Sequence, residues 1–433
     1  MMRDLRSLTL VFALRFFYLA SSFLLSSAIT KILDVSAFGS FSISQAVVLM
    51  VYSFAIAGVP TLIVRETASE NDSANEVATG RVVRSLLKWV VAGGVLTLTV
   101  ALILLGVFGA DRIVLVTSAI GLPAILMLGL SVVMNSVLRG KNRVFESQIG
   151  DMFLRPAIYL SLVFLIRVGV AGLVSPAVVM VAFDVATFVA LIFSYSRFRT
   201  LTLIGDPEEK TLGAQATWQP LKQLASIDLI HAVSLYSPTI VIGFVAAERD
   251  VALFRIAFQI SLLLPTGLYV ANAIYYPRMC ELFKGRRVEQ VELICRKCCL
   301  VGFVFAVLVA VMLGLCGKSF ISFFFDDRYL DSIPVLVALG AVQLLNAFTG
   351  PLDLVLTAAN LEKLLMRTRG AALLFQVPAL AIGAHLYGAI GAAVAYGIAF
   401  LVWNVVLWCV VYHRLGIIAF PSISALQLRT KGS

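Results

Sequence analysis

The chain has 433 residues, of which 60% are hydrophobic and 13% are charged, and its mean hydropathy is +0.98. Ordinary soluble domains carry about 25% charged residues, so this composition excludes a soluble globular fold, which could not bury so much apolar surface. The basic excess, 34 Lys and Arg against 24 Asp and Glu, forms no stripe interleaved with aromatic residues, which argues against nucleic-acid binding.

Long apolar runs predict an all-α integral membrane fold. Each is about as long as a helix must be to cross roughly 30 Å of hydrocarbon, and none alternates with the period of two that a transmembrane strand requires. The first run begins at Leu8 and is longer than a signal-peptide core, so we expect it to be a retained span. We predict about twelve spans, near residues 8–32, 41–64, 86–109, 113–138, 154–173, 176–195, 224–246, 251–275, 298–316, 333–358, 370–388 and 390–412.

The distribution of basic residues predicts the orientation of these spans. With the N-terminus inside, 26 of the 34 Lys and Arg residues lie in inner segments and 7 in outer segments, while Arg15 lies within the first span. Positive residues collect on the cytoplasmic side of membrane proteins. Both termini are therefore predicted to be cytoplasmic.

The two halves of the sequence resemble repeats. We predict an N-terminal lobe over residues 1–200 and a C-terminal lobe over 223–433, with six spans each and a cytoplasmic linker at 201–222. Matching residues recur at a nearly constant offset: Asp34 and Asp250 at 216, Asn142 and Asn360 at 218, and Gly169-Val-Ala-Gly172 and Gly388-Ala-Ile-Gly391 at 219. Because six is even, the lobes share one orientation, and we expect two pseudo-symmetric lobes around a central cavity.

Motifs for nucleotide or metal chemistry are missing from the sequence. It has no G-x-x-x-x-G-K-[ST] loop and no H-E-x-x-H motif. Cys295-Arg-Lys-Cys298-Cys299 contains a C-x-x-C, but the chain has only three histidines to complete a zinc site, so we interpret these cysteines as small residues at the membrane edge. We expect no metal, cofactor or nucleotide, and an ion gradient or the membrane potential as the source of energy. A membrane-embedded enzyme stays an alternative, although the large polar loop that it needs is missing.

Ionisable residues inside spans are costly, so they usually face a bundle interior or a water-filled cavity. Arg15 lies about two turns into the first span, and Tyr18 and Ser22 follow it on the same helical face. We interpret the three as cavity residues that bind substrate; snorkelling of Arg15 to the inner interface is the alternative. His231 is the repeat partner of Arg15 and a further cavity candidate, the alternative being a hydrogen-bonded interior histidine.

Three more ionisable residues are candidates within spans. Asp184 lies in the middle of span six, where a carboxylate needs a cation, a proton or a sodium ion. Asp353 follows Gly350-Pro351 in span ten, at a place where we expect a broken helix. We assign both to ion coupling, with a buried structural polar group as the alternative. Arg255 begins span eight, either as a cavity residue or as an outer-interface anchor. Because several candidates are cationic, the predicted cavity suits an anionic ligand such as a phosphate-bearing lipid head group.

Ordered motifs along residues 8–412 resemble the polysaccharide-unit flippases of the MOP superfamily, the Wzx-type O-antigen and exopolysaccharide transporters. No single motif is diagnostic; the resemblance rests on the set, on the twelve spans and on the length. The motifs are Phe38-Gly39-Ser40-Phe41, Gly58-Val59-Pro60, Ser136-Val-Leu-Arg139-Gly140, Arg155-Pro156, Arg255-Ile-Ala257-Phe258-Gln259, the segment from Phe323 to Leu336, and Tyr387-Gly388-Ala-Ile-Gly391. One departure is Asp326-Asp327, where the family often has a glycine.

The resemblance implies a transporter of the bacterial inner membrane that works by alternating access. Its substrate would be an undecaprenyl-pyrophosphate-linked oligosaccharide, moved from the cytoplasmic to the periplasmic leaflet, and its partners would be membrane lipids and other membrane proteins of polysaccharide assembly. Related lipid flippases place functional arginines in the first and eighth spans, which correspond to Arg15 and Arg255. A multidrug or cation antiporter of the same superfamily is the alternative. Such antiporters favour acidic cavities, so the sign of the cavity charge distinguishes the two.

Overall fold

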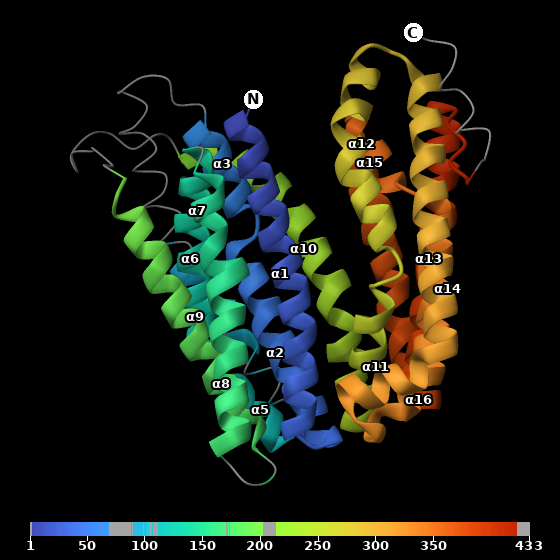
Figure 1. Cartoon of the computed structure of the whole chain (residues 1–433). Coiled ribbons are helices and arrows are strands. Elements are labelled where there is room, and N and C mark those ends of the chain that lie inside the picture. Colours follow the sequence, from blue (N-terminus) through green and yellow to red (C-terminus); the bar gives the residue numbers. More distant parts are fainter. Residues whose placement is uncertain are drawn as a thin grey trace. The chain divides into compact units, whose positions relative to one another are not determined.

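A computed structural model describes residues 2–68, 88, 90–97, 99–101, 103, 106, 111–141, 143–169, 172, 174–201 and 214–421. All regular structure within these residues is helical, which confirms the predicted fold class (Figure 1). The chain divides into two compact units, Met1–Ile240 and Val241–Ser433. We call them the N-unit and the C-unit. Most of the predicted linker, residues 202–213, lies outside the described residues, so the predicted lobe boundaries stay predictions.

The described part of the N-unit is built from packed helices of different lengths. Its α1 and α8 pack along one another, and α6 packs against both α3 and α9. A single π-helical turn, η1, joins α7 to α8. The elements are α1 (Met2–Ile32), α2 (Val35–Ile56), α3 (Val59–Ala68), α5 (Arg112–Ile120), α6 (Leu122–Gly140), α7 (Val144–Ile149), η1 (Gly150–Leu154), α8 (Arg155–Gly169), α9 (Pro176–Phe198) and the first part of α10 (Ala214–Val245).

The C-unit continues this pattern. Its α12 and α13 pack along one another, and α14 packs against α11, α13 and α16. The elements are α11 (Glu248–Ser261), α12 (Thr266–Lys284), α13 (Val288–Phe325), the 3-10 helix η2 (Asp327–Ser332), α14 (Ile333–Thr349), α15 (Leu352–Ala358) and α16 (Glu362–Leu415).

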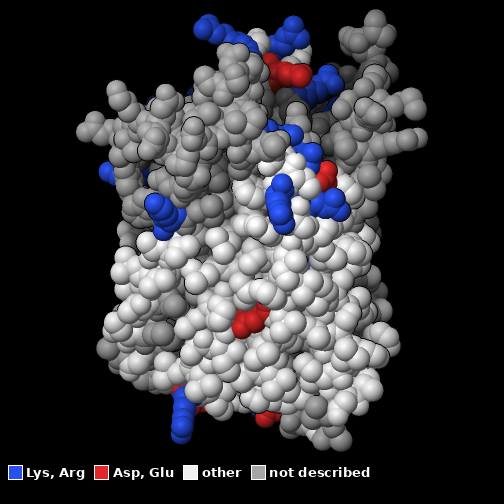
Figure 2. All heavy atoms as spheres, turned by 90° about the vertical axis from the view of Figure 1, so that its left-hand side faces the viewer, with Lys and Arg blue, Asp and Glu red and all other residues white. Residues whose placement is uncertain are grey.

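Eight described helices are long and apolar enough to cross a membrane, or nine if the bent pair α11–α12 is one span. The chain is therefore a multi-pass membrane protein. Figure 2 agrees, since one face carries a broad band of uncharged side chains with basic side chains gathered at one end. The number twelve stays a prediction, because most of the predicted third span falls on residues that are only partly described.

Several predicted spans are broken or longer than expected. The second begins at Val35 and is interrupted at Ala57 and Gly58, and the eighth is bent by 49° between α11 and α12. The ninth is part of the 38-residue α13, which at about 1.5 Å per residue far exceeds the hydrocarbon thickness. The predicted break at Gly350-Pro351 is confirmed, because α14 ends at Thr349 and α15 begins at Leu352.

The last two predicted spans form a tight hairpin within α16. Tyr387 and Gly388 have non-helical dihedral angles, with φ +58° and ψ −140° at Gly388. On either side of this bend Gly383 and Gly391 touch, so that a Cβ on Gly383 would lie 2.5 Å from the carbonyl oxygen of Gly391. The Asp250 Oδ1 at the start of α11 accepts a hydrogen bond from the Ala389 amide at 2.9 Å, which ties the bend to α11.

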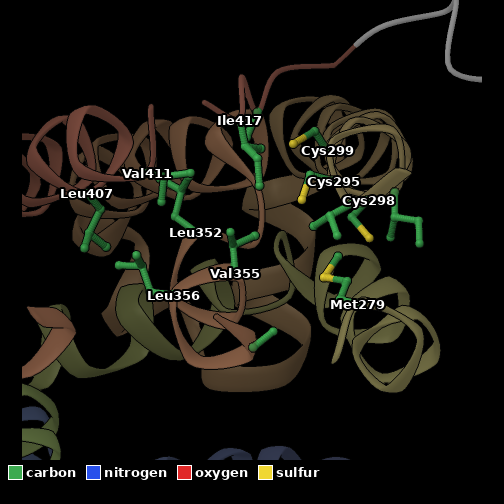
Figure 3. Packing of buried hydrophobic residues seen from close by; sticks show 14 of the residues in the cluster. Met279, Cys295, Cys298, Cys299, Leu352, Val355, Leu356, Leu407, Val411 and Ile417 are labelled. Carbon is green, nitrogen blue, oxygen red and sulfur yellow. The ribbon is translucent and has the colours of Figure 1, made fainter. Parts of the chain in front are cut away.

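A buried hydrophobic cluster in the C-unit includes cysteines (Figure 3). Cys295, Cys298 and Cys299 on α13 are fully buried beside Met279 and face residues of α15 and α16 such as Leu352. They act as small apolar packing residues. They therefore lie in a protein core, and their predicted level at the membrane edge stays a prediction.

Candidate functional site

The N-unit holds a group of polar side chains that converge from four elements. Tyr52 lies on α2, Asn135 and Arg139 on α6, Asp151 on η1, and Arg155 at the start of α8. We call these five residues the N-unit polar cluster. The π-helical turn widens the helix where Asp151 lies, and such turns occur frequently at functional sites.

Asp151 is the centre of the N-unit polar cluster. Its Oδ2 accepts a hydrogen bond from the side-chain amide nitrogen (Nδ2) of Asn135 at 2.8 Å, and its Oδ1 lies 3.5 Å from an Arg155 guanidinium nitrogen. The side chains of Arg155 and Asp151 are only 19% and 23% exposed. Charges that are buried to this extent are retained where they are paired or bind something charged.

The second arginine of this cluster is held by its own helix. The Arg139 guanidinium donates to the Ser136 Oγ at 3.1 Å and to the Asn135 carbonyl oxygen at 3.4 Å, so neither bond engages an acid. Tyr52 interacts electrostatically with Asp151, Arg155 and Arg139. Two arginines against one aspartate give the cluster a net positive charge. The buried Asn135 Oδ1 has no hydrogen-bond partner among the described residues.

The C-unit holds a corresponding group, which we call the C-unit polar cluster. An Arg369 guanidinium nitrogen on α16 lies 3.6 Å from Asp353 Oδ2 on α15, and the guanidinium stacks 5.0 Å from the Trp403 ring centre. On α14, the Thr349 hydroxyl oxygen lies 3.1 Å from Asn404 Oδ1 of α16, and at the same distance from two carbonyl oxygens of its own helix. The break between α14 and α15 makes this possible, because it begins at Gly350 with φ +76° and directs α15 toward α16.

The two clusters occupy equivalent positions in the repeat. Asn135 and Asp151 are 16 residues apart, and Asp353 and Arg369 have the same separation. Adding 218 to the first pair gives the second, and this is the offset that relates Asn142 to Asn360. Each pair links the end of one span to the start of the next. The repeat predicted from a few matching residues thus also relates two polar pairs of different chemistry.

The residues predicted for the first span lie together on α1. Tyr18 is 37% exposed and Ser22 is half-buried, and Arg15 lies within the helix, with its side chain outside the described set. His231 lies exposed on α10 in the N-unit. Arg255 lies half-buried on α11 of the C-unit. Their shared role in one cavity stays a prediction.

Asp184 lies half-buried in the middle of α9, at the border between the buried and the exposed face of this helix. Val181, Val185 and Phe188 around it are 48%, 44% and 52% exposed. Its Oδ1 is buried and has no hydrogen-bond partner among the described residues, and the same holds for the nearby Tyr159 hydroxyl on α8. Asp353, in contrast, is paired with Arg369.

Sequence reasoning did not identify the N-unit polar cluster. Arg139 and Arg155 flank an inner loop, so they were interpreted as positive-inside residues. The available signal was Asp151, one turn before Arg155, because an acid and a base four residues apart share a helix face. The 16-residue spacing that recurs in the second half was a further signal.

Comparisons with known proteins identify the family and the fold. A profile of the family described as "Polysaccharide biosynthesis protein" matches residues 11–283. A search of the curated proteins gives no match. Solved structures with the same fold include transporters of the MOP superfamily and a flippase, so the chain has a MOP-type fold.

Three of these structures cover nearly all of this chain. An inward-facing multidrug resistance MATE family transporter of the MOP superfamily has 16% identity and a TM-score of 0.73, covering 94% of this chain and 95% of its own. The lipid II flippase MurJ, in an inward closed conformation, has 13% identity and a TM-score of 0.73, covering 94% and 87%. A MOP superfamily transporter from Pyrococcus furiosus, described as having a binding pocket of reverse polarity that suggests a different function, has 15% identity and a TM-score of 0.64, covering 95% of each chain.

These comparisons confirm, at the level of family and fold, the resemblance to polysaccharide-unit flippases of the MOP superfamily. The profile covers more than half of the chain, and the helical architecture matches MOP superfamily transporters over almost all of it. The chain belongs to the polysaccharide biosynthesis protein family.

Proposed function

We propose that the chain is a secondary transporter that flips undecaprenyl-pyrophosphate-linked oligosaccharide units from the cytoplasmic to the periplasmic leaflet of a bacterial inner membrane by alternating access. The observation that carries the proposal is the match to the polysaccharide biosynthesis family over residues 11–283, in a chain with the MOP transporter fold. Such a protein moves its cargo without forming or breaking covalent bonds.

The charge of the N-unit polar cluster supports an anionic cargo. Arg139 and Arg155 are opposed only by Asp151 within this cluster, and a guanidinium donates two parallel hydrogen bonds to phosphate oxygens. The cluster lies at the C-terminal end of α6 and at the start of α8, on the predicted cytoplasmic side. A pyrophosphate head group would enter from that side. Arg15, Tyr18, Ser22, His231 and Arg255 are the further residues that we assign to substrate binding.

Ion coupling is assigned to Asp184 in preference to Asp353. A carboxylate that carries a proton or sodium ion through a cycle must be able to release its partner. Asp353 already has Arg369 as a counter-ion, whereas Asp184 Oδ1 has no partner among the described residues. The energy would come from an ion gradient or the membrane potential, with no nucleotide.

A multidrug or cation antiporter is the alternative that the fold favours equally, because the MATE transporter and MurJ have the same TM-score of 0.73. An organic cation would be repelled by the net positive charge of the N-unit polar cluster. The alternatives therefore differ in the sign of charge that the protein moves.

The experiment is transport by the purified protein in proteoliposomes. We expect it to move a fluorescent polyprenyl-pyrophosphate-linked glycan between leaflets and to leave a cationic dye in place. The double variant Arg139→Gln, Arg155→Gln should lower glycan movement by about tenfold or more, since losing one partner of a buried charge contact costs about 2 kcal/mol or more.

The matched control is Arg197→Gln, which removes an exposed arginine at the end of α9 and should leave transport unchanged. Movement of the dye in place of the glycan would establish the antiporter and refute the flippase. Equal glycan movement by the double variant and the control would remove the N-unit polar cluster from the transport path.

A further inference from the structure

A groove on the surface of the N-unit, between α1 and α8, combines an apolar floor with two basic residues. Its volume is about 570 Å³, and its apolar walls include Leu24 and Ala28 of α1 and Phe164 of α8. Lys31 of α1 and Arg167 of α8 also line it. The groove plays no part in the polar clusters described above.

Small side chains create this groove. Ser27 and Ala28 on α1 and Ser161 on α8 leave space between two helices that otherwise pack closely. The Ser161 hydroxyl donates to the Ala157 carbonyl oxygen of its own helix at 2.8 Å. Because that donor is already used, the wall at this point offers little to a polar ligand and suits a hydrocarbon chain.

Both basic residues lie at the same end of the groove. Lys31 is one residue from the end of α1, and Arg167 is two residues from the end of α8, and Figure 1 shows these two helices running side by side to one end of the unit. Leu24 lies seven residues before Lys31, which is about 10 Å along a helix. In the predicted topology the ends of these two helices lie at the level of the lipid head groups, so a groove of this length would extend through about two-thirds of one leaflet.

We propose that this groove binds an anionic phospholipid, with its phosphate at Lys31 and Arg167 and an acyl chain along Leu24 and Phe164. Charge complementarity selects a head group with net negative charge over a zwitterionic one. The nearby Asp34 does not cancel this preference: it is a single acid against two bases, and its Oδ1 accepts the capping hydrogen bond from the Ala37 amide. Basic pockets between transmembrane helices bind anionic lipids in this way.

Exposure favours a bulk membrane lipid over the rare lipid-linked cargo. Leu24, Phe164 and Leu165 are 46%, 62% and 63% exposed, so the groove opens along its length to the surrounding bilayer and fills by mass action with abundant lipids. In the predicted orientation the site lies in the periplasmic leaflet. The inference is independent of the proposed cargo.

The test measures lipids retained by the full chain in native mass spectrometry. Protein from nanodiscs of phosphatidylcholine with 20 mol% phosphatidylglycerol should retain phosphatidylglycerol preferentially. At about 1 kcal/mol per basic residue near the membrane surface, the double variant Lys31→Gln, Arg167→Gln should lose this retention by about tenfold or more. Ala28→Phe, which fills the groove and leaves both charges, should also lose it.

Arg112→Gln is the matched control, because Arg112 is exposed at the start of α5 and does not line the groove; it should retain lipid as the wild type does. Equal retention of phosphatidylcholine and phosphatidylglycerol by the wild type would overturn the charge selection. Unchanged retention by the double variant would overturn the site. If undecaprenyl phosphate at equal mole fraction displaced phosphatidylglycerol, the occupant would be the carrier lipid and the proposal would be wrong.

Discussion

The proposed role of Arg15 in substrate binding can be tested directly by mutation. It lies inside α1, and its spacing from Tyr18 and Ser22 predicts that the three share one helix face. If it binds the pyrophosphate, Arg15→Ala should lower export by about one to three orders of magnitude, since such a contact is worth about 2–4 kcal/mol. Arg15→Lys should fall between Ala and wild type, because an ammonium keeps the charge and loses the two-pronged geometry.

Snorkelling of Arg15 makes a different prediction. Lysine would then match the wild type, and alanine would lower only the amount of inserted protein. The measurement is surface polysaccharide per unit of inserted protein for the wild type, Arg15→Ala and Arg15→Lys. Equal normalised export from all of them would remove Arg15 from the transport site.

Asp326 has a backbone conformation that only glycine adopts without strain. Its φ is +94° and its ψ 154°, a conformation that costs a residue with a side chain of order 1–3 kcal/mol. The side chain compensates, because Oδ1 accepts from the Arg328 amide at 3.3 Å and Oδ2 from the Arg328 guanidinium at 3.4 Å. Partial burial alone would raise its pKa, but the bonds to Arg328 outweigh this and hold the pKa below its ordinary value.

The stability of the wild type and of two variants at residue 326 should therefore follow a fixed order. Asp326→Gly loses the bonds and the strain together, so its unfolding temperature should stay near that of the wild type. Asp326→Ala loses the bonds and keeps the strain, so it should be the least stable. Because the pKa is lowered on folding, the carboxylate stabilises the fold above about pH 4, and the gap between Asp and Ala should narrow as the pH falls below that value. If Asp326→Gly were less stable than Asp326→Ala, residue 326 would carry no backbone strain, which contradicts this interpretation.

At the scale of elements, the bend in α16 depends on the contact between Gly388 and Asp250. A Cβ on Gly388 would lie 2.5 Å from Asp250 Oδ1, and φ is +58° there. Gly388→Ala should therefore destabilise the fold by at least about 1–3 kcal/mol. Asp250→Ala removes both the clash and the bond to the Ala389 amide, so the double variant should be less destabilised than the sum of the single variants.

The measurement is thermal unfolding of the four members of this cycle in nanodiscs. Gly314→Ala is the matched control, because a Cβ at that position in α13 meets nothing within 4 Å and alanine favours a helix more than glycine does. Strict additivity of the Gly388 and Asp250 effects would mean that the contact does not hold the bend.

Sequence patterns predicted the elements better than their irregularities. Long apolar runs identify spans because lipid requires about 20 apolar residues, and Gly350-Pro351 correctly signalled a break. The π-turn at Gly150–Leu154 was not predicted, because its residues carry no pattern that distinguishes it from an α-helix. The long extension of α13 was also missed, since its basic residues resemble an ordinary loop, although Glu292 pairs with Arg296 along the helix.

At the scale of the whole molecule, the predicted repeat relates the two polar pairs, so matched variants can test both. Asp353 and Arg369 are 39% and 30% exposed, so their pair is worth up to about 1 kcal/mol, or about fivefold in activity. Asp353→Arg and Arg369→Asp should each lower export by about threefold or more, because each brings like charges together. The double exchange should recover part of the loss, and Asn135→Ala in the N-unit should lower export to a similar degree.

Export is measured per unit of inserted protein, as for Arg15. If the double exchange were no better than the worse single variant, the ion pair would have no role of its own. The repeat is predicted from a nearly constant offset between the halves. Its polar pairs could not be predicted in this way, because Asn135–Asp151 and Asp353–Arg369 differ in chemistry, and only tertiary packing reveals that each bridges consecutive spans.

The central claim is that the chain flips a lipid-linked glycan outward, and the most direct measurement is the leaflet in which that glycan accumulates when the chain is absent. Inverted and right-side-out membrane vesicles from a deletion strain would be treated with a glycan-modifying enzyme that cannot cross the membrane. If the chain is this flippase, a pyrophosphate-linked oligosaccharide should be accessible to the enzyme only in inverted vesicles. It should disappear after complementation with the wild type. A deletion strain with no accumulated glycolipid, or with one accessible from the outside, would contradict the claim.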